Sequence, residues 1–402
     1  MSDPAKRADV LVLGGGIIGL AVAWRAAGLG MSVTLLERDL TGQGASRVAA
    51  GMLAPVAEAE FGSAGRRVLE LGLHSAGMWP AFAAELEEAS GGTSVGLRSA
   101  GTLLVARDED EARELERQIA FRHSLGLRAD RLRPSAARER EPALAPTVRL
   151  ALEAPEDRSV DPRLVLGALR RACLSAGVLV RERAPVAALE LGASGDRVTG
   201  VTLRSGERLQ AARVVMAAGA WVGWIEGLPS GSQVPVRAVK GQILRLRDRA
   251  GPGMLERVVR FEGGYLVPRA DGRYVLGATV EERGFELAPT VGGVYELLKD
   301  AHAVVPAVSE LEIEELCVGL RPGTPDNAPA IGPCAVEGLI WATGHHRNGI
   351  LLAPLTAELV AQTLAGERPE KALLEACEPT RFNRGAGTGG PDPRVRPPVA
   401  LG

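Results

Sequence analysis

A cluster of glycines at residues 14–19 constrains this chain more than any other feature of its sequence. The cluster, GGGIIG, follows an apolar run at residues 9–13 and opens a helical pattern at residues 17–28. A second apolar run comes next, at residues 32–37, so the order predicts a strand–helix–strand unit. Apolar residues make up 46% of the chain and aromatic residues only 3%, so small aliphatic side chains must build the core, which suits parallel α/β packing.

The spacing GxGxxG gives three of these glycines separate roles. Gly14 permits the tight turn, Gly16 lets a pyrophosphate approach the backbone, and Gly19 lets the helix pack close to the strand. Free N–H groups and the dipole at the helix N-terminus attract the anion. Glu37 ends the second strand, where its carboxylate accepts a hydrogen bond from a ribose 2′-hydroxyl and repels a 2′-phosphate. This combination predicts a dinucleotide site, whereas the glycines alone also fit a turn in an ordinary α/β protein.

The segment that follows the second strand favours FAD over NAD. Residues 42–53 read GQGASRVAAGML, and most of their side chains are small. An NAD enzyme would normally continue into another strand and helix, whereas small side chains let a segment pass beside a buried, extended cofactor. On composition alone, a surface loop is the alternative.

Composition and charge argue against several classes of protein. The chain has 402 residues, of which 47 are basic and 49 acidic, so its net charge of −2 gives no basic field for a nucleic-acid backbone. The longest apolar stretch, residues 10–24, is shorter than the roughly 20 residues that cross a bilayer. Four cysteines without a CxxC pair and five histidines predict no disulfide framework, no zinc site and a cytoplasmic location.

Local patterns predict further elements. Asp161 and Pro162 fit the N-cap and first position of a helix that runs to about Ala176. Periodic charges at residues 108–125 predict an amphipathic surface helix, and two strand-like runs around Asp271-Gly272 predict a hairpin. The end of the chain, residues 379–402, is predicted to be a disordered tail.

Longer stretches resemble the FAD-dependent amine oxidase family that includes D-amino-acid oxidase, sarcosine oxidase and glycine oxidase. Two of them adjoin the glycine cluster, GGGIIGLAVAWRAAGLGMSVTLLER and GASRVAAGML. The others, all downstream, are VKGQILRL, GGYLVPRADGRYVLGATVE, GLRPGTPDNAPAIG and ATGHHRNGILLAP. Together they are spread over most of residues 9–366, and within the family they most resemble the glycine oxidases of thiamin biosynthesis.

The resemblance implies an α/β fold of two domains. A Rossmann-like, glutathione-reductase-like FAD-binding domain would comprise residues 1–87, 150–228 and 318–378. A substrate-binding domain with a mixed, largely antiparallel sheet would comprise residues 88–149 and 229–317. The family resemblance also suggests a homo-oligomer such as a tetramer.

The same resemblance places FAD along residues from distant parts of the chain. These are Gly14, Gly16, Ile17, Gly19, Glu37, Arg38, Ala45, Ser46, Ala50, Gly51, Met52, Val186, Gly219, His345, Arg347, Asn348, Gly349, Ile350 and Leu351. Some relatives attach FAD covalently through a cysteine. Cys317 is offset by two residues from that position, so we expect FAD to be bound noncovalently.

Amino-acid oxidation by a flavin needs few side chains, because the Cα hydrogen leaves as a hydride and the protein supplies orientation. A carboxylate clamp is needed, and arginine provides the planar, bidentate pairing. The resemblance places the clamp at Arg321, with the hydroxyl of Tyr265 as its partner. A surface arginine and a core tyrosine are the alternatives on sequence alone. Some relatives carry a histidine two residues before the tyrosine, where this chain has Gly263.

In the segment GHHRNGILLAP the resemblance places Arg347 near the substrate or the flavin ring. It places His346 where an aromatic residue is common, and we expect His346 to shape the pocket and to add positive charge that helps oxygen react. Asn348 and Gly349 predict a turn that leads into a helix whose N-terminus faces the flavin. The pair of adjacent histidines is not expected to bind a metal.

The resemblance implies oxidation of glycine to its imine, with catalytic roles for Arg321, Tyr265 and Arg347 and a further substrate contact from His346. Oxygen would become hydrogen peroxide, and the imine would supply the thiazole of thiamin. Sarcosine or a small D-amino acid is a plausible side substrate. The alternatives are a D-amino-acid oxidase or a dehydrogenase of different substrate range, and a non-catalytic FAD-binding redox module, which needs neither Arg321 nor Tyr265.

Overall fold

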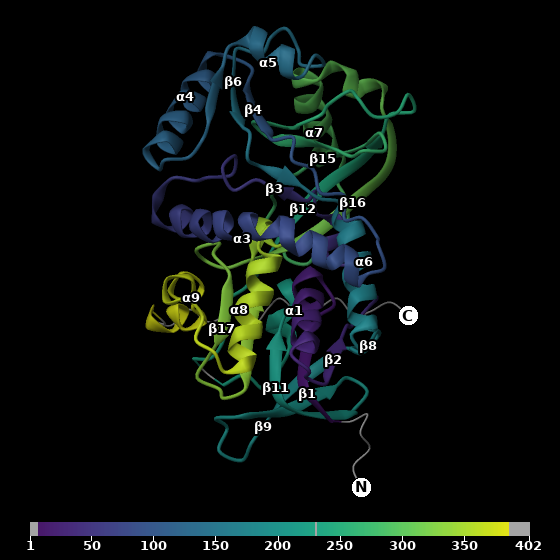
Figure 1. Cartoon of the computed structure of the whole chain (residues 1–402), viewed down its shortest axis with the longest axis vertical. Coiled ribbons are helices and arrows are strands. Elements are labelled where there is room, and N and C mark those ends of the chain that lie inside the picture. Colours follow the sequence, from purple (N-terminus) through teal and green to yellow (C-terminus); the bar gives the residue numbers. More distant parts are fainter. Residues whose placement is uncertain (1–6, 230, 386–402) are drawn as a thin grey trace.

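Two eight-stranded sheets organise the computed structural model, which describes residues 7–229 and 231–385 (Figure 1). In the first sheet the strand order is β17-β18-β11-β1-β2-β8, with β10 paired to β11 and to β9. Strands β1 and β2 are parallel and α1 separates them in the chain, so the predicted strand–helix–strand unit is confirmed. The strands of this sheet are β1 Arg7–Leu13, β2 Val33–Leu36, β8 Leu179–Arg181, β9 Val186–Leu191, β10 Val198–Leu203, β11 Arg208–Met216, β17 Ala330–Pro333 and β18 Leu339–Thr343.

The second sheet has the order β16-β12-β15-β14-β13-β4-β6-β5, and the β13–β4 pair is its parallel one. It is therefore mixed and largely antiparallel, as expected, and the predicted hairpin is β14–β15. Its strands are β4 Thr102–Ala106, β5 Asp130–Leu132, β6 Leu150–Ala154, β12 Arg237–Arg247, β13 Val258–Phe261, β14 Gly264–Pro268, β15 Arg273–Gly277 and β16 Glu312–Gly323. A short antiparallel pair, β3 Met52–Leu53 and β7 Arg158–Ser159, stands apart from both sheets.

The predicted cap of α6 is confirmed, and α4 carries a cap that was not predicted. The Asp161 side chain accepts a hydrogen bond from the backbone N–H of Arg163, and α6 begins at Pro162. Asp108 caps α4 in the same way. The α-helices are α1 Ile17–Gly28, α2 Ala45–Val48, α3 Gly62–Ala89, α4 Glu109–Ser124, α5 Pro134–Arg140, α6 Pro162–Ser175, α7 Val291–Val304, α8 Ala353–Ala365 and α9 Lys371–Cys377. The 3₁₀ helices are η2 Gly219–Trp224, η3 Pro306–Glu310, η4 His346–Asn348 and η5 Pro379–Gly385. Across the described ranges, no helix is long and apolar enough to cross a membrane.

Close backbone contact seats α1 against the first sheet. A Cβ atom on Gly19 would overlap the Gly14 carbonyl oxygen, at a separation well below 3.0 Å. The helix can therefore approach the turn only because residue 19 has no side chain. Around α1, buried side chains of α3, α6 and α8 join one core with residues of β1 and β2. This packing fixes the helix N-terminus above the end of β1.

The long helix α3 lies across the middle of the molecule (Figure 1) and has no counterpart among the sequence predictions. Glycines within it and Pro80 weaken the helical pattern, so tertiary packing decides its length. Its buried Ser75 and Trp79 side chains both donate hydrogen bonds to the carbonyl oxygen of Leu351. Helix α3 therefore braces the chain just before α8.

Two predicted boundaries need correction. Strand β6 begins at Leu150 and β16 extends past residue 318, so the expected limits at 150 and 318 both fall on strands of the second sheet. Strand pairing holds these segments in that sheet, which local composition does not reveal. The tail prediction is wrong for residues 379–385, because η5 forms there and Arg381 hydrogen-bonds Asp326 at 3.0 Å. The rest of the predicted tail, residues 386–402, lies outside the described residues.

Replacing Gly19 with alanine should destabilise the protein by about 1–3 kcal/mol, because the new methyl group overlaps backbone rather than a movable side chain. Urea unfolding measures the change. Gly28→Ala, at the far end of the same helix, is the control, since a Cβ there meets nothing within 4 Å and should not destabilise. Equal stability of the Gly19→Ala variant and the parent would contradict the close-packing account.

Candidate active site

A cavity of about 1550 Å³ lies between the two sheets. Leu13 and Leu36, at the carboxyl ends of β1 and β2, line it on one side, and Ile243 and Tyr265 of the second sheet line it on another. The carboxyl ends of parallel strands are where α/β proteins bind ligands. Ordinary small-molecule sites measure roughly 300–1,000 Å³, so this one has room for a large cofactor together with a small substrate.

The glycine turn forms the bottom of one end of the cavity. Gly14 has a φ of 111°, and a Cβ on it would lie 2.5 Å from the Ala217 carbonyl oxygen. Gly16 and Ile17 line the cavity at the start of α1, where the backbone N–H of Ile17 donates to the Ser46 hydroxyl at 3.0 Å. The bare backbone and the helix N-terminus therefore form the cradle that a pyrophosphate requires.

Glu37 stands at the edge of the same cradle. One carboxylate oxygen accepts a hydrogen bond from the backbone N–H of Gly15 at 2.7 Å, and the other accepts one from Asp39 at 2.9 Å. These bonds fix the carboxylate on the cavity wall, and each oxygen retains a lone pair for a hydroxyl. The position fits the ribose contact expected from the sequence.

Residues 42–53, most of which have small side chains, form a wall of the cavity. Their interpretation as a plain surface loop is therefore wrong. Two buried arginines of the second sheet region donate to their carbonyl oxygens: Arg245 to Arg47 at 2.7 Å, and Arg269 to Ala50. The five expected contacts of this segment all line the cavity. They are Ala45, Ser46, Ala50, Gly51 and Met52.

Other expected cofactor residues meet the same cavity from different elements. Val186 and Gly219 line it, and the Arg38 guanidinium lies 3.8 Å above the ring of Trp221. His345, Arg347, Gly349 and Ile350 line it also.

Three of the predicted cofactor residues do not line this cavity. Gly19 acts at the helix–turn contact described above. Asn348 borders a separate, small pocket, and Leu351 is buried with its carbonyl oxygen bound to α3. Their effect on a cofactor would therefore be indirect.

Arg321 of β16 and Tyr265 of β14 both line the cavity from the second sheet, in which β12 and β15 lie between their strands. A guanidinium N–H of Arg321 donates to the carbonyl oxygen of Thr279 at 3.0 Å, which anchors one side of the group. Burial raises the pKa of Tyr265, and the charges of Arg321 and Arg260 oppose that shift. The phenol is thus a neutral hydrogen-bond donor next to two guanidinium groups, which is what a carboxylate ligand needs.

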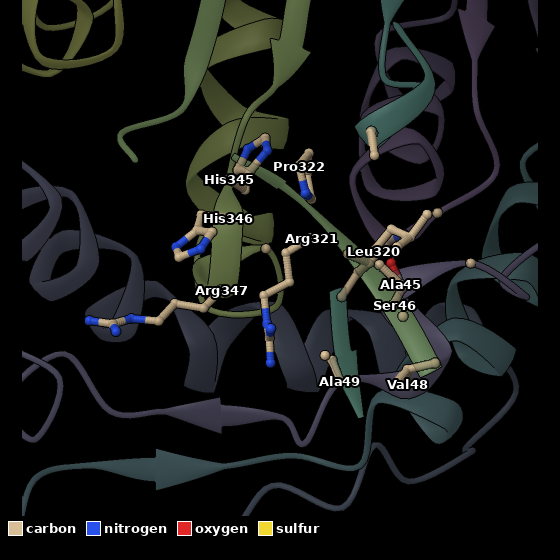
Figure 2. A pocket seen from close by; sticks show the side chains of 18 of the residues that line it. Ala45, Ser46, Val48, Ala49, Leu320, Arg321, Pro322, His345, His346 and Arg347 are labelled. Carbon is tan, nitrogen blue, oxygen red and sulfur yellow. Dashed lines mark hydrogen bonds between the residues drawn. The ribbon is translucent and has the colours of Figure 1, made fainter. Parts of the chain in front are cut away.

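Figure 2 shows that Arg347 extends in a different direction from Arg321. Its guanidinium donates to Glu60 at 2.6 Å and to the carbonyl oxygen of Glu58 at 3.3 Å. Burial lowers the pKa of Arg347, yet the charges of Glu58 and Glu60 outweigh it and raise that pKa. Arg347 is therefore a fixed cation on the cavity wall whose charge is already matched by carboxylates.

The two histidines beside Arg347 are neutral. Burial lowers the pKa of His345 to about 3, and its Nε2 atom shares a hydrogen bond of 2.9 Å with the Thr356 hydroxyl. Burial and the charges of Arg321 and Arg347 lower the pKa of His346 to about 3. The expectation that His346 supplies positive charge is therefore wrong, although it does line the cavity. Across the described residues, no group of three potential metal ligands occurs.

Sequence reasoning missed several residues of this wall. Glu58 and Arg260 both line the cavity, and their side chains pair at 3.4 Å. Asp300 fills the space beside Gly263, since a Cβ there would lie 2.5 Å from its carboxylate. Arg260 could have been found from its place opposite Tyr265 in the β13–β14 hairpin, whereas Glu58 and Asp300 carry no local signal.

The fold and the cradle define an FAD-binding oxidoreductase, and the chain belongs to the family of FAD dependent oxidoreductases (DAO), whose model matches residues 9–363. It is 36% identical over 369 residues to a glycine oxidase of Geobacillus kaustophilus, covering 91% of this chain and 95% of that protein. It is 37% identical over 379 residues to a bifunctional protein ThiO/ThiG of Synechocystis, covering 93% of this chain but only 54% of that relative.

The solved structures agree with this assignment. A crystal structure of glycine oxidase from Geobacillus kaustophilus superposes with a TM-score of 0.83 at 34% identity, covering 90% of this chain and 96% of that one. The predicted fold class and the FAD cofactor are therefore confirmed.

Because the folded-state pKa of His345 lies below its usual value of about 6.5, the unfolded chain binds this proton first. Its contribution to stability is complete above pH 6.5 and is lost as the pH falls from 6.5 towards 3. Urea unfolding at several pH values between 7 and 5 measures how the free energy of unfolding depends on pH. The slope of this dependence should be smaller for His345→Gln than for the parent, by up to about 1.4 kcal/mol per pH unit. His302→Gln, at an exposed position of α7, is the control. An unchanged slope for His345→Gln would refute the low pKa of His345 in the folded protein.

Proposed function

We propose that this protein oxidises glycine to its imine, which water converts to glyoxylate and ammonia, while O₂ is reduced to H₂O₂. The observation that carries the proposal is the pairing of Arg321 with Tyr265 on the wall of a cavity whose other end is a dinucleotide cradle. The similarity to glycine oxidases over more than nine-tenths of the chain supports it.

The residues of the cradle would hold FAD, which would supply the two-electron oxidation of the substrate carbon. Arg321 binds the substrate carboxylate through paired N–H donors, and Tyr265 donates its hydroxyl to the same group. With one end of the substrate fixed, the Cα hydrogen has a defined orientation, which is the main contribution that the protein makes. Arg347 and His346 close the wall beside the clamp, with His346 neutral.

The imine is also the product that thiazole formation in thiamin synthesis would use, and the relative named ThiO/ThiG supports this role. A D-amino-acid oxidase or dehydrogenase of different substrate range is the alternative within this fold. Rates measured with glycine, sarcosine, D-alanine and D-proline, together with oxygen uptake, separate these functions.

Replacing Arg321 with alanine should leave FAD bound but slow the bleaching of the flavin by glycine about 100-fold, since a paired, charged hydrogen bond is lost. Anaerobic mixing in a stopped-flow spectrometer measures this rate. Arg131→Ala is the matched control, because Arg131 lies on β5 and pairs with Glu116 on the surface. Unchanged bleaching in the Arg321→Ala variant would reject the clamp, and loss of FAD would assign Arg321 to the cofactor site.

We propose further that FAD is held without a covalent bond. Cys317 does not line the cavity, and its sulfur atom lies 3.8 Å from the Arg163 guanidinium. Acid precipitation should therefore release the yellow colour into the supernatant, and colour that stays in the pellet would disprove the proposal.

We also propose a cytoplasmic location and self-association. All four cysteines are free thiols, which fits a reducing compartment. Exposed apolar side chains of α7, Val291 and Tyr295, offer a surface for another copy of the chain. Light scattering of the purified protein measures the oligomeric state.

A further inference from the structure

Two glycines of the second sheet lie directly beneath the clamp. A Cβ atom on Gly241 would stand 2.5 Å from an Nη atom of Arg321 and 2.6 Å from its Cζ. A Cβ on Gly277 would stand 2.5 Å from the hydroxyl oxygen of Tyr265 and 2.7 Å from two atoms of its ring. Real Cβ atoms essentially never approach so closely, so both clamp groups rest on bare backbone.

The sheet register explains why each glycine meets its own partner. Tyr265 of β14 and Gly277 of β15 are opposite each other in the antiparallel ladder, and the phenol ring folds over the glycine. Gly241 of β12 is opposite Gly319 of β16, and Arg321 lies two residues further along β16, on the same face, so its guanidinium reaches Gly241 diagonally. A glycine inside a strand weakens it, so its presence at both positions needs a reason other than sheet stability.

The neighbours of Gly241 show that this face of β12 is reserved for the cavity. Lys240 and Gln242 alternate with it and are fully buried on the opposite face. The Lys240 ammonium donates to the Ala288 carbonyl oxygen at 2.6 Å, and Gln242 donates to Thr290 at 3.0 Å. The sequence VKGQ thus holds the segment before α7 with two side chains while leaving the clamp side empty.

We propose that Gly241 and Gly277 are positioning residues of the carboxylate clamp. The missing side chain at each position lets the Arg321 guanidinium and the Tyr265 hydroxyl pack directly against the backbone of the sheet. This packing sets the position at which the substrate carboxylate binds. The inference rests on the proposed function in one respect, namely that the clamp binds an amino-acid carboxylate.

The atoms that block a new Cβ belong to the ends of side chains, not to backbone. An added methyl group therefore displaces the clamp group into the cavity more readily than it unfolds the sheet. A carboxylate that is misplaced by about 1 Å can cost as much as 100-fold in rate. Gly241→Ala and Gly277→Ala should each raise KM for glycine about tenfold or more, with FAD content and thermal midpoint close to those of the parent.

Titration of the protein with glycolate, followed by the absorbance change of the bound flavin, gives the dissociation constant of glycolate. This constant is a readout that does not depend on turnover. It should rise by the same factor as KM in both variants. Gly292→Ala is the matched control, since a Cβ at this position of α7 meets nothing within 4 Å, and both constants should stay at the parent value.

Paired variants test whether each glycine acts through its own partner. Once Tyr265 is replaced by alanine, Gly277→Ala should have no further effect on glycolate binding, while Gly241→Ala should still weaken it. In an Arg321→Ala background the roles should reverse, because the guanidinium group that covers Gly241 is then absent.

Additive effects in both backgrounds, or loss of FAD from both alanine variants, would overturn the proposal, because either result assigns the glycines to sheet structure. Failure of the parent protein to oxidise glycine would reject the proposed function instead. The glycolate titrations would then still decide whether the two glycines position the clamp.

Discussion

The contact between the start of α1 and the turn after β1 is the interaction on which the site depends. Gly19 sits on the Gly14 carbonyl oxygen, which brings the helix N-terminus to the mouth of the parallel sheet. The turn itself closes on Ala217 at the end of the neighbouring strand β11. Two separate stretches of chain, residues 14–19 and the end of β11, therefore meet at one point without any side chain between them. The positive end of the helix dipole lies there beside bare glycine backbone, so the anion site is a consequence of close packing.

The second sheet contributes the substrate end and also reaches back to hold the cofactor wall. Arg245 and Arg269 extend from it to the carbonyl oxygens of residues 47 and 50, which face the cavity segment. Burial lowers the pKa of both arginines, to about 10 for Arg269, but leaves them charged at neutral pH. Charged donors on backbone carbonyls are strong hydrogen bonds in a buried setting. The cofactor wall and the clamp are thus tied to the same sheet, which fixes their separation.

The sequence allowed the prediction of the parts that depend on local pattern. The glycine spacing, the acidic end of β2 and the Asp161-Pro162 cap are each contained within a few residues, and the structure has them as expected. Helix α3, the place of β6 in the second sheet and the cavity side chains Glu58 and Asp300 depend on packing between distant segments. The charge of His346 could not be predicted from the sequence either, because its neutral state comes from burial and from arginines that only the fold brings near it. The prediction of Arg321 and Tyr265 depended on the family resemblance. On residue type alone, Arg321 also fits a surface arginine and Tyr265 also fits a core tyrosine.

Strand β12 serves two sides of the sheet through strict alternation, with Gly241 towards the clamp and its neighbours Lys240 and Gln242 towards the segment before α7. Because the pleat repeats every two residues, a slip of one position would exchange the two sets. The ammonium of Lys240 would then project among the arginines of the cavity, and the far side would lose both of its anchors. A single-residue insertion or deletion next to Gly241 should therefore disrupt both faces, whereas the register shift that this strand pair already carries, between Arg245 and Leu246, lies beyond the clamp.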